Sequence, residues 1–159
     1  MRADTLPSAK LGREGGAILR VRPHSFIEDA HMFISQSQFQ GVRFRLNVRA
    51  VDANNHPAAS LITQDGQFAL PDSARGWQHI DLRPYNVDVG AEARVAVTLE
   101  WLAGQPTPGK PTTWRDWPSV LVPAAFSATH RTVFRHKSED AWQVQPVNLS
   151  LYITTASPD

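Results

Sequence analysis

The sequence of 159 residues contains no cysteine, which excludes disulfide bonds, thiolate metal ligands and a cysteine nucleophile. Charged residues make up only 19% of it and the net charge is +1, so no bulk electrostatic attraction to nucleic acid or to an anionic membrane is expected. No apolar run approaches the roughly 20 residues of a membrane-spanning helix, and residues 1–7 lack the apolar core of a signal peptide. Two interpretations remain open: the protein is cytoplasmic, or the sequence is the mature part of an exported protein with an added initiator methionine.

The sequence also lacks the short motifs that announce an enzymatic reaction. It has no Gly-x-Ser-x-Gly nucleophile elbow, no His-Glu-x-x-His zinc motif and no glycine-rich loop for phosphate. We therefore expect a protein without catalytic activity.

Alternation of apolar and polar residues is the clearest positive signal. Residues 95–101 place one set of side chains on one face of a strand: Val95, Val97, Leu99 and Trp101. The other face carries Ala96, Thr98 and Glu100. Successive side chains in a strand point to opposite faces, so this pattern predicts a strand with one buried face. A second strand, 42–51, sends its apolar residues to one side and its arginines to the other.

Several shorter alternating segments, interrupted by 12 prolines and 9 glycines, extend this pattern to both ends of the chain. No amphipathic helix of useful length is present, and eight or more short strands indicate an all-β fold. We predict a two-sheet β-sandwich of the jelly-roll type. We expect residues 1–16 to form a flexible or edge arm and residues 17–159 to form one domain.

A set of ordered short motifs supports the same fold by resemblance. They are Val42-x-Phe44-Arg45-x-Asn47-Val48, Trp77-x-x-Ile80-Asp81-Leu82-x-x-Tyr85-Asn86-Val87-x-Val89, Leu99-Glu100-Trp101, Phe126-Ser127-Ala128, Phe134-Arg135, Trp142 and Leu151-Tyr152-Ile153. Together they resemble the C-terminal β-rich module of exported Bacteroidetes proteins labelled carboxypeptidase-like regulatory-domain proteins. The resemblance implies a β-sandwich in the cell envelope or outside the cell. It implies no peptidase activity, because the label names the neighbouring domain.

The arginines of strand 42–51 form the first candidate site. Arg43, Arg45 and Arg49 project from one side of that strand, and Glu100 projects from the non-core side of strand 95–101. If the two strands share a sheet, Arg45 and Glu100 can pair across it. We favour a solvated face with an ion pair, and the alternative is a groove for an anionic ligand such as an acidic sugar.

The tryptophans divide by context. Parity places Trp101 in the core, and we expect Trp77 and Trp142 there as well. Trp114 and Trp117 lie in a proline-rich loop with polar neighbours. They suit either a sugar-stacking platform or a plug that closes one end of the sandwich.

Metal and catalytic sites receive weaker support. His79 and Asp81 are two residues apart and would share a face of a strand, but a metal site needs three or four converging ligands. The other histidines are His24, His31, His56, His130 and His136. Loop aspartates that could hold a structural Ca²⁺ ion are Asp52, Asp65, Asp72 and Asp88, although no aspartate-rich loop is present. We expect no cofactor.

The expected function is a non-catalytic binding or interaction module of the cell envelope or exterior, with a protein as partner or a structural role. The first alternative is a carbohydrate-binding module that uses Trp114, Trp117, Arg43, Arg45 and Glu100. The second alternative is an enzyme with an unrecognised site around His79 and Asp81.

Overall fold

The computed structural model describes residues 13–34, 36–37, 39–72, 74–106, 120–121, 124–137 and 139–157. Within these ranges the protein is all-β, and its only helical element is the 3₁₀ turn η2 (Arg83–Tyr85). All strand pairings are antiparallel. The predicted all-β class is confirmed, and the jelly-roll connectivity stays a prediction.

The larger of two main sheets has seven strands in the order β13-β12-β1-β9-β4-β5, with β6 beside β4. Their bounds are β1 Glu14–Arg20, β4 Phe39–Val51, β5 Pro57–Ser60, β6 Gln67–Ala69, β9 Arg94–Pro106, β12 Arg131–Arg135 and β13 Gln143–Gln145. The long strands β4 and β9, which contain the two alternating segments of the sequence, are neighbours.

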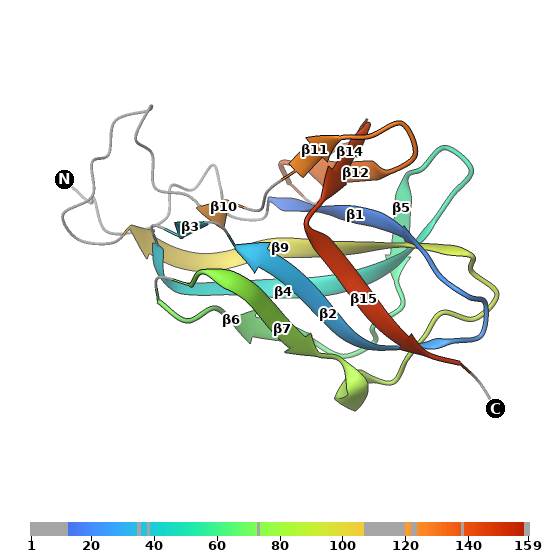
Figure 1. Ribbon diagram of the computed structural model, residues 1–159, viewed down its shortest axis with the longest axis horizontal. Coiled ribbons are helices and arrows are strands. Elements are labelled where there is room, and N and C mark those ends of the chain that lie inside the picture. Colours follow the sequence, from blue (N-terminus) through green and yellow to red (C-terminus); the bar gives the residue numbers. More distant parts are fainter. Residues whose placement is uncertain are drawn as a thin grey trace.

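The smaller sheet has the order β15-β2-β7, with β8 beside β2. Its strands are β2 Phe26–Ile34, β7 Gly76–Asp81, β8 Val87–Asp88 and β15 Leu151–Ala156. Two short pairings join β3 (Gln36–Ser37) to β10 (Val120–Leu121) and β11 (Ala124–Phe126) to β14 (Val147–Leu149). In Figure 1, β2 and β15 cross in front of β4 and β9, and β7 lies beside β2.

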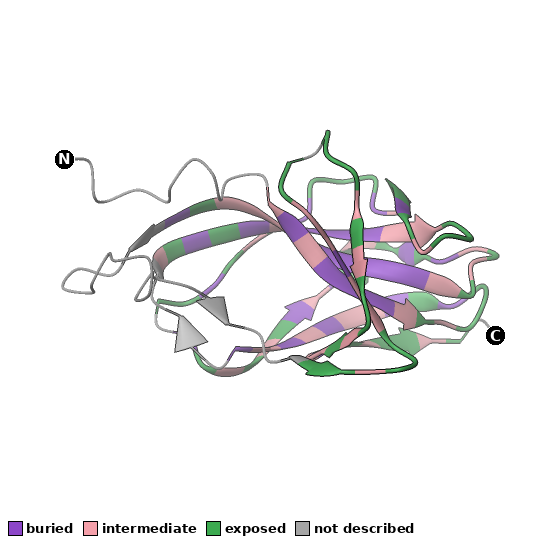
Figure 2. Ribbon diagram, turned by 90° about the horizontal axis from the view of Figure 1, so that it is seen from above, coloured by how far each residue is buried: buried purple, intermediate pink, exposed green. Residues whose placement is uncertain are grey.

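The main hydrophobic core lies between these two sheets. Its buried members on the long strands are Val42, Phe44, Leu46, Val48, Val95 and Val97. Those on the smaller sheet include Ala30, Met32, Ile34, Ile80 and Leu151. Leu99 and Trp101 are partly buried against the same core, so the predicted core face of strand 95–101 is confirmed. Figure 2 shows the buried residues on the strands, where they alternate with intermediate and exposed ones, and many exposed residues on the connections.

The larger sheet curls, so that its second face is covered as well. Ile18 of β1, Ala96 of β9 and Val133 of β12 form a separate buried cluster. Val51, Trp142 and Val144 pack against that cluster. Ala96 and Thr98 are therefore fully buried at 0% exposure, and the prediction of a single buried face was wrong for this part of β9. Sequence alternation cannot reveal it, because the cover comes from β12 and β13, more than 30 residues away.

The strand β1 begins at Glu14, inside the segment assigned to the N-terminal arm. It pairs with β9 on one side and with β12 on the other, so this part of the segment is internal to the sheet. Gly16 is required there, because a Cβ atom at this position would lie 1.8 Å from the carbonyl oxygen of Val97. Residues 1–12 lie outside the described residues.

Candidate functional site

The outward side chains of β7 begin the candidate site. Ile80 points into the core, so strand parity sends Trp77, His79 and Asp81 to the outer face of the smaller sheet. The predicted shared face of His79 and Asp81 is confirmed. The expected core position of Trp77 was wrong, because its side chain is 55% exposed. The same parity argument, applied to Trp77, would have placed it correctly.

Three rings stack across the three strands of this sheet. His31 of β2 lies in register with His79 of β7 on one side and with Tyr152 of β15 on the other. The ring centroids of His31 and His79 are 5.1 Å apart, and those of His31 and Tyr152 are 4.4 Å apart with an interplanar angle of 12°. The antiparallel register therefore fixes a ladder of two imidazoles and one phenol ring.

A carboxylate lies at one end of this ladder. Asp29 Oδ1 is 2.5 Å from His79 Nε2, and Asp29 Oδ2 accepts a hydrogen bond of 2.9 Å from the Thr154 hydroxyl. The contact with His79 is the main reason why the pKa of Asp29 is lowered. Asp29 is thus an anion with one oxygen oriented by Thr154 and the other by the imidazole.

Apolar rings lie beside this polar group. Trp77 makes edge contacts with Phe33, at 5.3 Å between centroids, and with Tyr152, at 5.2 Å. Tyr152 is 46% exposed. We call the surface formed by Asp29, His31, Phe33, Trp77, His79 and Tyr152 the outer face. It combines exposed aromatic rings with hydrogen-bonding groups on a rigid sheet.

The predicted pairing of Arg45 with Glu100 is confirmed. The two residues are in register between β4 and β9, and Arg45 Nη1 lies 3.0 Å from Glu100 Oε2. Arg45 also pairs with Asp65 at 2.8 Å, and both carboxylates raise its pKa. Arg43 is exposed on the same strand. Arg45 is therefore already paired with two carboxylates, which makes a groove for an anionic ligand at this position less favourable.

Farther along β4, the face predicted to be solvated is buried, which corrects that expectation. Asn47 is 7% exposed, and both Asn47 and Arg49 donate hydrogen bonds to Glu14. Arg49 uses a fork of two donors, Nε at 2.8 Å and Nη2 at 3.2 Å. Arg135 Nη2 donates to the same carboxylate at 3.0 Å, and Thr98 donates its hydroxyl.

This Glu14 cluster is a buried ion-pair network. Glu14 is 1% exposed, and the indole of Trp142 covers Arg135 at 4.3 Å. Burial alone raises the pKa of Glu14, but the hydrogen bonds from Arg49, Thr98 and Arg135 outweigh burial and lower it. Both oxygens of the Glu14 carboxylate accept hydrogen bonds from side chains of the protein itself, so we assign the cluster a structural role.

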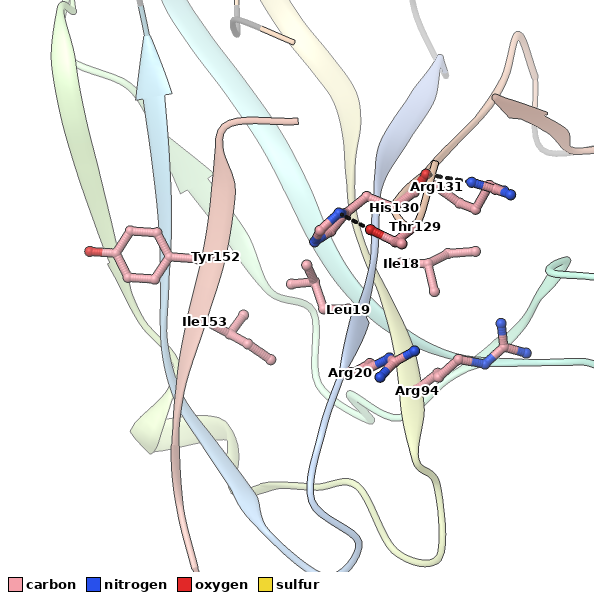
Figure 3. A pocket seen from close by; sticks show the side chains of 9 residues that line it. All are labelled: Ile18, Leu19, Arg20, Arg94, Thr129, His130, Arg131, Tyr152 and Ile153. Atoms are coloured by element: carbon pink, nitrogen blue, oxygen red, sulfur yellow. Dashed lines mark hydrogen bonds between the residues drawn. The ribbon is translucent and has the colours of Figure 1, made fainter. Parts of the chain in front are cut away.

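A pocket of about 570 Å³ opens between β1 and β15. Its lining contains Ile18, Leu19, Arg20, Arg94, Thr129, His130, Arg131, Tyr152 and Ile153. Figure 3 shows the guanidinium groups of Arg94 and Arg131 pointing away from Tyr152, whose ring points to the opposite side. Arg94 is further held by Asn55 and by the carbonyl of Asp52. Arg94 and Arg131 therefore do not converge with Tyr152 on one ligand position.

The remaining predicted residues take structural positions or lie outside the described part of the chain. The four loop aspartates are all engaged by the protein itself. Asp52 accepts hydrogen bonds from the backbone N–H groups of Asn54 and His56, and Asp65 forms an ion pair with Arg45. Asp72 accepts a hydrogen bond from the N–H of Gly41, and Asp88 accepts one from the N–H of Gly90. Trp142 packs against the second cluster, as expected. Trp114 and Trp117 lie outside the described residues.

Comparisons with known proteins give no assignment, since no protein family, curated protein or solved structure matches this chain. The resemblance to the exported Bacteroidetes modules stays a prediction. In the part of the chain that the structure describes, no helix has the length and apolar character needed to cross a membrane.

Proposed function

We propose that this domain is a non-catalytic carbohydrate-binding module and that the outer face is its binding surface. The observation that carries the proposal is the exposure of Trp77 and Tyr152, at 55% and 46%, next to the carboxylate of Asp29 and the imidazole of His79. A sugar presents C–H faces that pack on aromatic rings and hydroxyl groups that bind carboxylates and imidazoles. The outer face offers both kinds of partner side by side.

The free energy available from burying the exposed indole of Trp77 supports a binding role. An aromatic side chain can bury about 200 Å², and each Å² of apolar surface contributes about 25 cal/mol when it leaves water. With 55% of Trp77 exposed, roughly 2–3 kcal/mol of burial free energy is not used in the isolated domain. A ligand that covers this ring gains that contribution.

A protein partner in the cell envelope was the leading expectation from the sequence, and it is the main competitor. Trp and Tyr are also frequent at the energetic centres of protein interfaces. The polar half of the outer face favours a sugar, because a protein interface centre is depleted of charged residues, and Asp29 is charged. The envelope or extracellular location in this proposal rests on the resemblance, and fractionation of the producing cell tests it.

Affinity electrophoresis through gels that contain neutral or acidic polysaccharides tests the proposal. We expect retardation of the wild-type domain and its loss in a Trp77→Ala/Tyr152→Ala variant. The matched control is Trp114→Ala/Trp117→Ala, which should remain retarded. Loss of retardation in this second variant alone would move the site to the proline-rich loop, as the sequence alternative has it. Absence of retardation by every polysaccharide, together with capture of a specific protein that Trp77→Ala abolishes, would replace the sugar by a protein partner.

A further inference from the structure

The polar half of the outer face brings together three side chains that ligate metals. Asp29, His31 and His79 each offer one ligand atom, and these three atoms all lie within 4.8 Å of one another. Among the described residues, this is the grouping of histidines and carboxylates with metal-site spacing. Sequence spacing could not reveal it, because His31 and His79 are 48 positions apart and meet only through the β2–β7 register.

We propose that Asp29, His31 and His79 bind a divalent transition-metal ion such as Zn²⁺. Imidazole nitrogen and carboxylate oxygen are the ligands that Zn²⁺ accepts, at about 2.0–2.2 Å. Tetrahedral geometry at these bond lengths separates neighbouring ligand atoms by about 3.3 Å. The three ligand atoms already lie within 4.8 Å of one another, so side-chain rotations that move them by about 1–2 Å bring them to the spacing of a bound ion.

The sheet holds the three ligands on one face. Asp29 and His31 are two residues apart on β2, so both project outward, and His79 is directly opposite His31 on β7. Thr154, in register with Asp29 on the other side, binds Oδ2 and leaves Oδ1 directed at His79. Thr154 thus takes the orienting position that outer-shell hydrogen bonds occupy in metal sites.

The metal would take the place of the hydrogen bond between His79 and Asp29. In the metal-free protein His79 Nε2 and Asp29 Oδ1 are 2.5 Å apart, and a contact this short requires a proton on one of the two atoms. Binding through Nε2 sends that proton to His79 Nδ1 or to solvent, and both Nε2 and Oδ1 then face the ion. Three protein ligands leave at least one coordination position for water or for an oxygen of a ligand on the outer face.

This inference is independent of the proposed sugar binding, because a domain that binds no polysaccharide can still bind the ion. The test is titration of the tag-free chain with Zn²⁺ by calorimetry and with Co²⁺ by visible absorption. We expect one ion per chain and a visible absorption spectrum typical of Co²⁺ that is bound by nitrogen and oxygen ligands. His31→Gln and His79→Gln should each weaken binding at least tenfold, and Thr154→Val should weaken it less.

His56→Gln is the matched control, since His56 lies in the exposed β4–β5 turn and should leave the affinity unchanged. Circular dichroism and the melting temperature without metal check that each variant is folded. Equal affinity of the wild type and a His31→Gln/His79→Gln variant would overturn the proposal, as would a stoichiometry that falls with His56→Gln. Retardation in polysaccharide gels, measured with and without EDTA, reports on the proposed function separately.

Discussion

Removal of the Glu14 charge is the sharpest test of how the curled sheet is stabilised. The Glu14→Gln substitution keeps the size of the side chain and removes the anion that faces Arg49 and Arg135. These two arginine side chains are only 16% and 13% exposed, so water cannot fully replace the lost partner. Breaking a buried ion pair on one side costs about 3–5 kcal/mol, and the amide oxygen of Gln recovers part of it. We expect a loss of about 3 kcal/mol of unfolding free energy at pH 7.

The pH dependence gives the same prediction a second readout. The pKa of Glu14 is lowered in the folded protein from its ordinary value of 4.5. A lowered pKa means that this stabilisation is present above the unfolded-state value and is lost as the pH falls through the folded-state value. The stability difference between wild type and Glu14→Gln should therefore be constant from pH 7 to about 5 and narrow below pH 4.5.

Urea denaturation followed by tryptophan fluorescence measures both effects. With a slope of about 2 kcal/mol/M, the expected loss lowers the midpoint by about 1.5 M without a change of slope. Glu92→Gln, on the turn before β9, removes the same charge from a partly exposed position and should have little effect. If Glu14→Gln matched wild type within about 0.5 kcal/mol at pH 7, the buried network would contribute nothing and our reasoning would be refuted.

Two further predictions concern the packing of β1 and β12. Gly16→Ala should prevent folding or cost more than about 4 kcal/mol, because its Cβ would overlap the Val97 carbonyl, whereas Gly15→Ala, with its nearest neighbour at 3.4 Å, should change stability by less than about 1 kcal/mol in the same urea assay. Val133→Ala should cost about 2 kcal/mol, since Val133 is 0% exposed inside the curl, and a cost near zero by thermal denaturation would mean that β12 does not cover this face.

The sequence was sufficient for those parts of the fold that depend on local alternation. Strand parity alone assigned Phe44, Leu46, Val95 and Val97 to the core. It also predicted that Arg45 pairs with Glu100 if the two strands share a sheet, and they are neighbours in the structure. A period of two is a strong local signal, because one residue of slippage would send a whole apolar set into water.

The buried charge and the candidate site depend on partners that are distant in sequence. Glu14 is 33 residues from Asn47 and 121 from Arg135, and nothing in its neighbourhood distinguishes it from a surface carboxylate. His31 and His79 were visible as separate histidines, but only the strand register brings them together. The expected core position of Trp77 was avoidable, because Trp77 and His79 are two residues apart on β7 and therefore project from the same, outer face.

The interleaving of early and late strands has a consequence for the order in which the chain can fold during synthesis. Glu14 of β1 can form its hydrogen bond with Arg135 only after 121 further residues have been synthesised. Asp29 of β2 likewise needs Thr154, which is 125 residues later in the chain. Until the last strands leave the ribosome, β1 and β2 each have an open edge toward solvent, of the kind that attracts chaperones and other chains. Closing such long loops also slows folding. The strands from β1 to β15 should therefore form one late, cooperative folding unit, and emergence of β12 to β15, rather than of the first half of the chain, should start its folding.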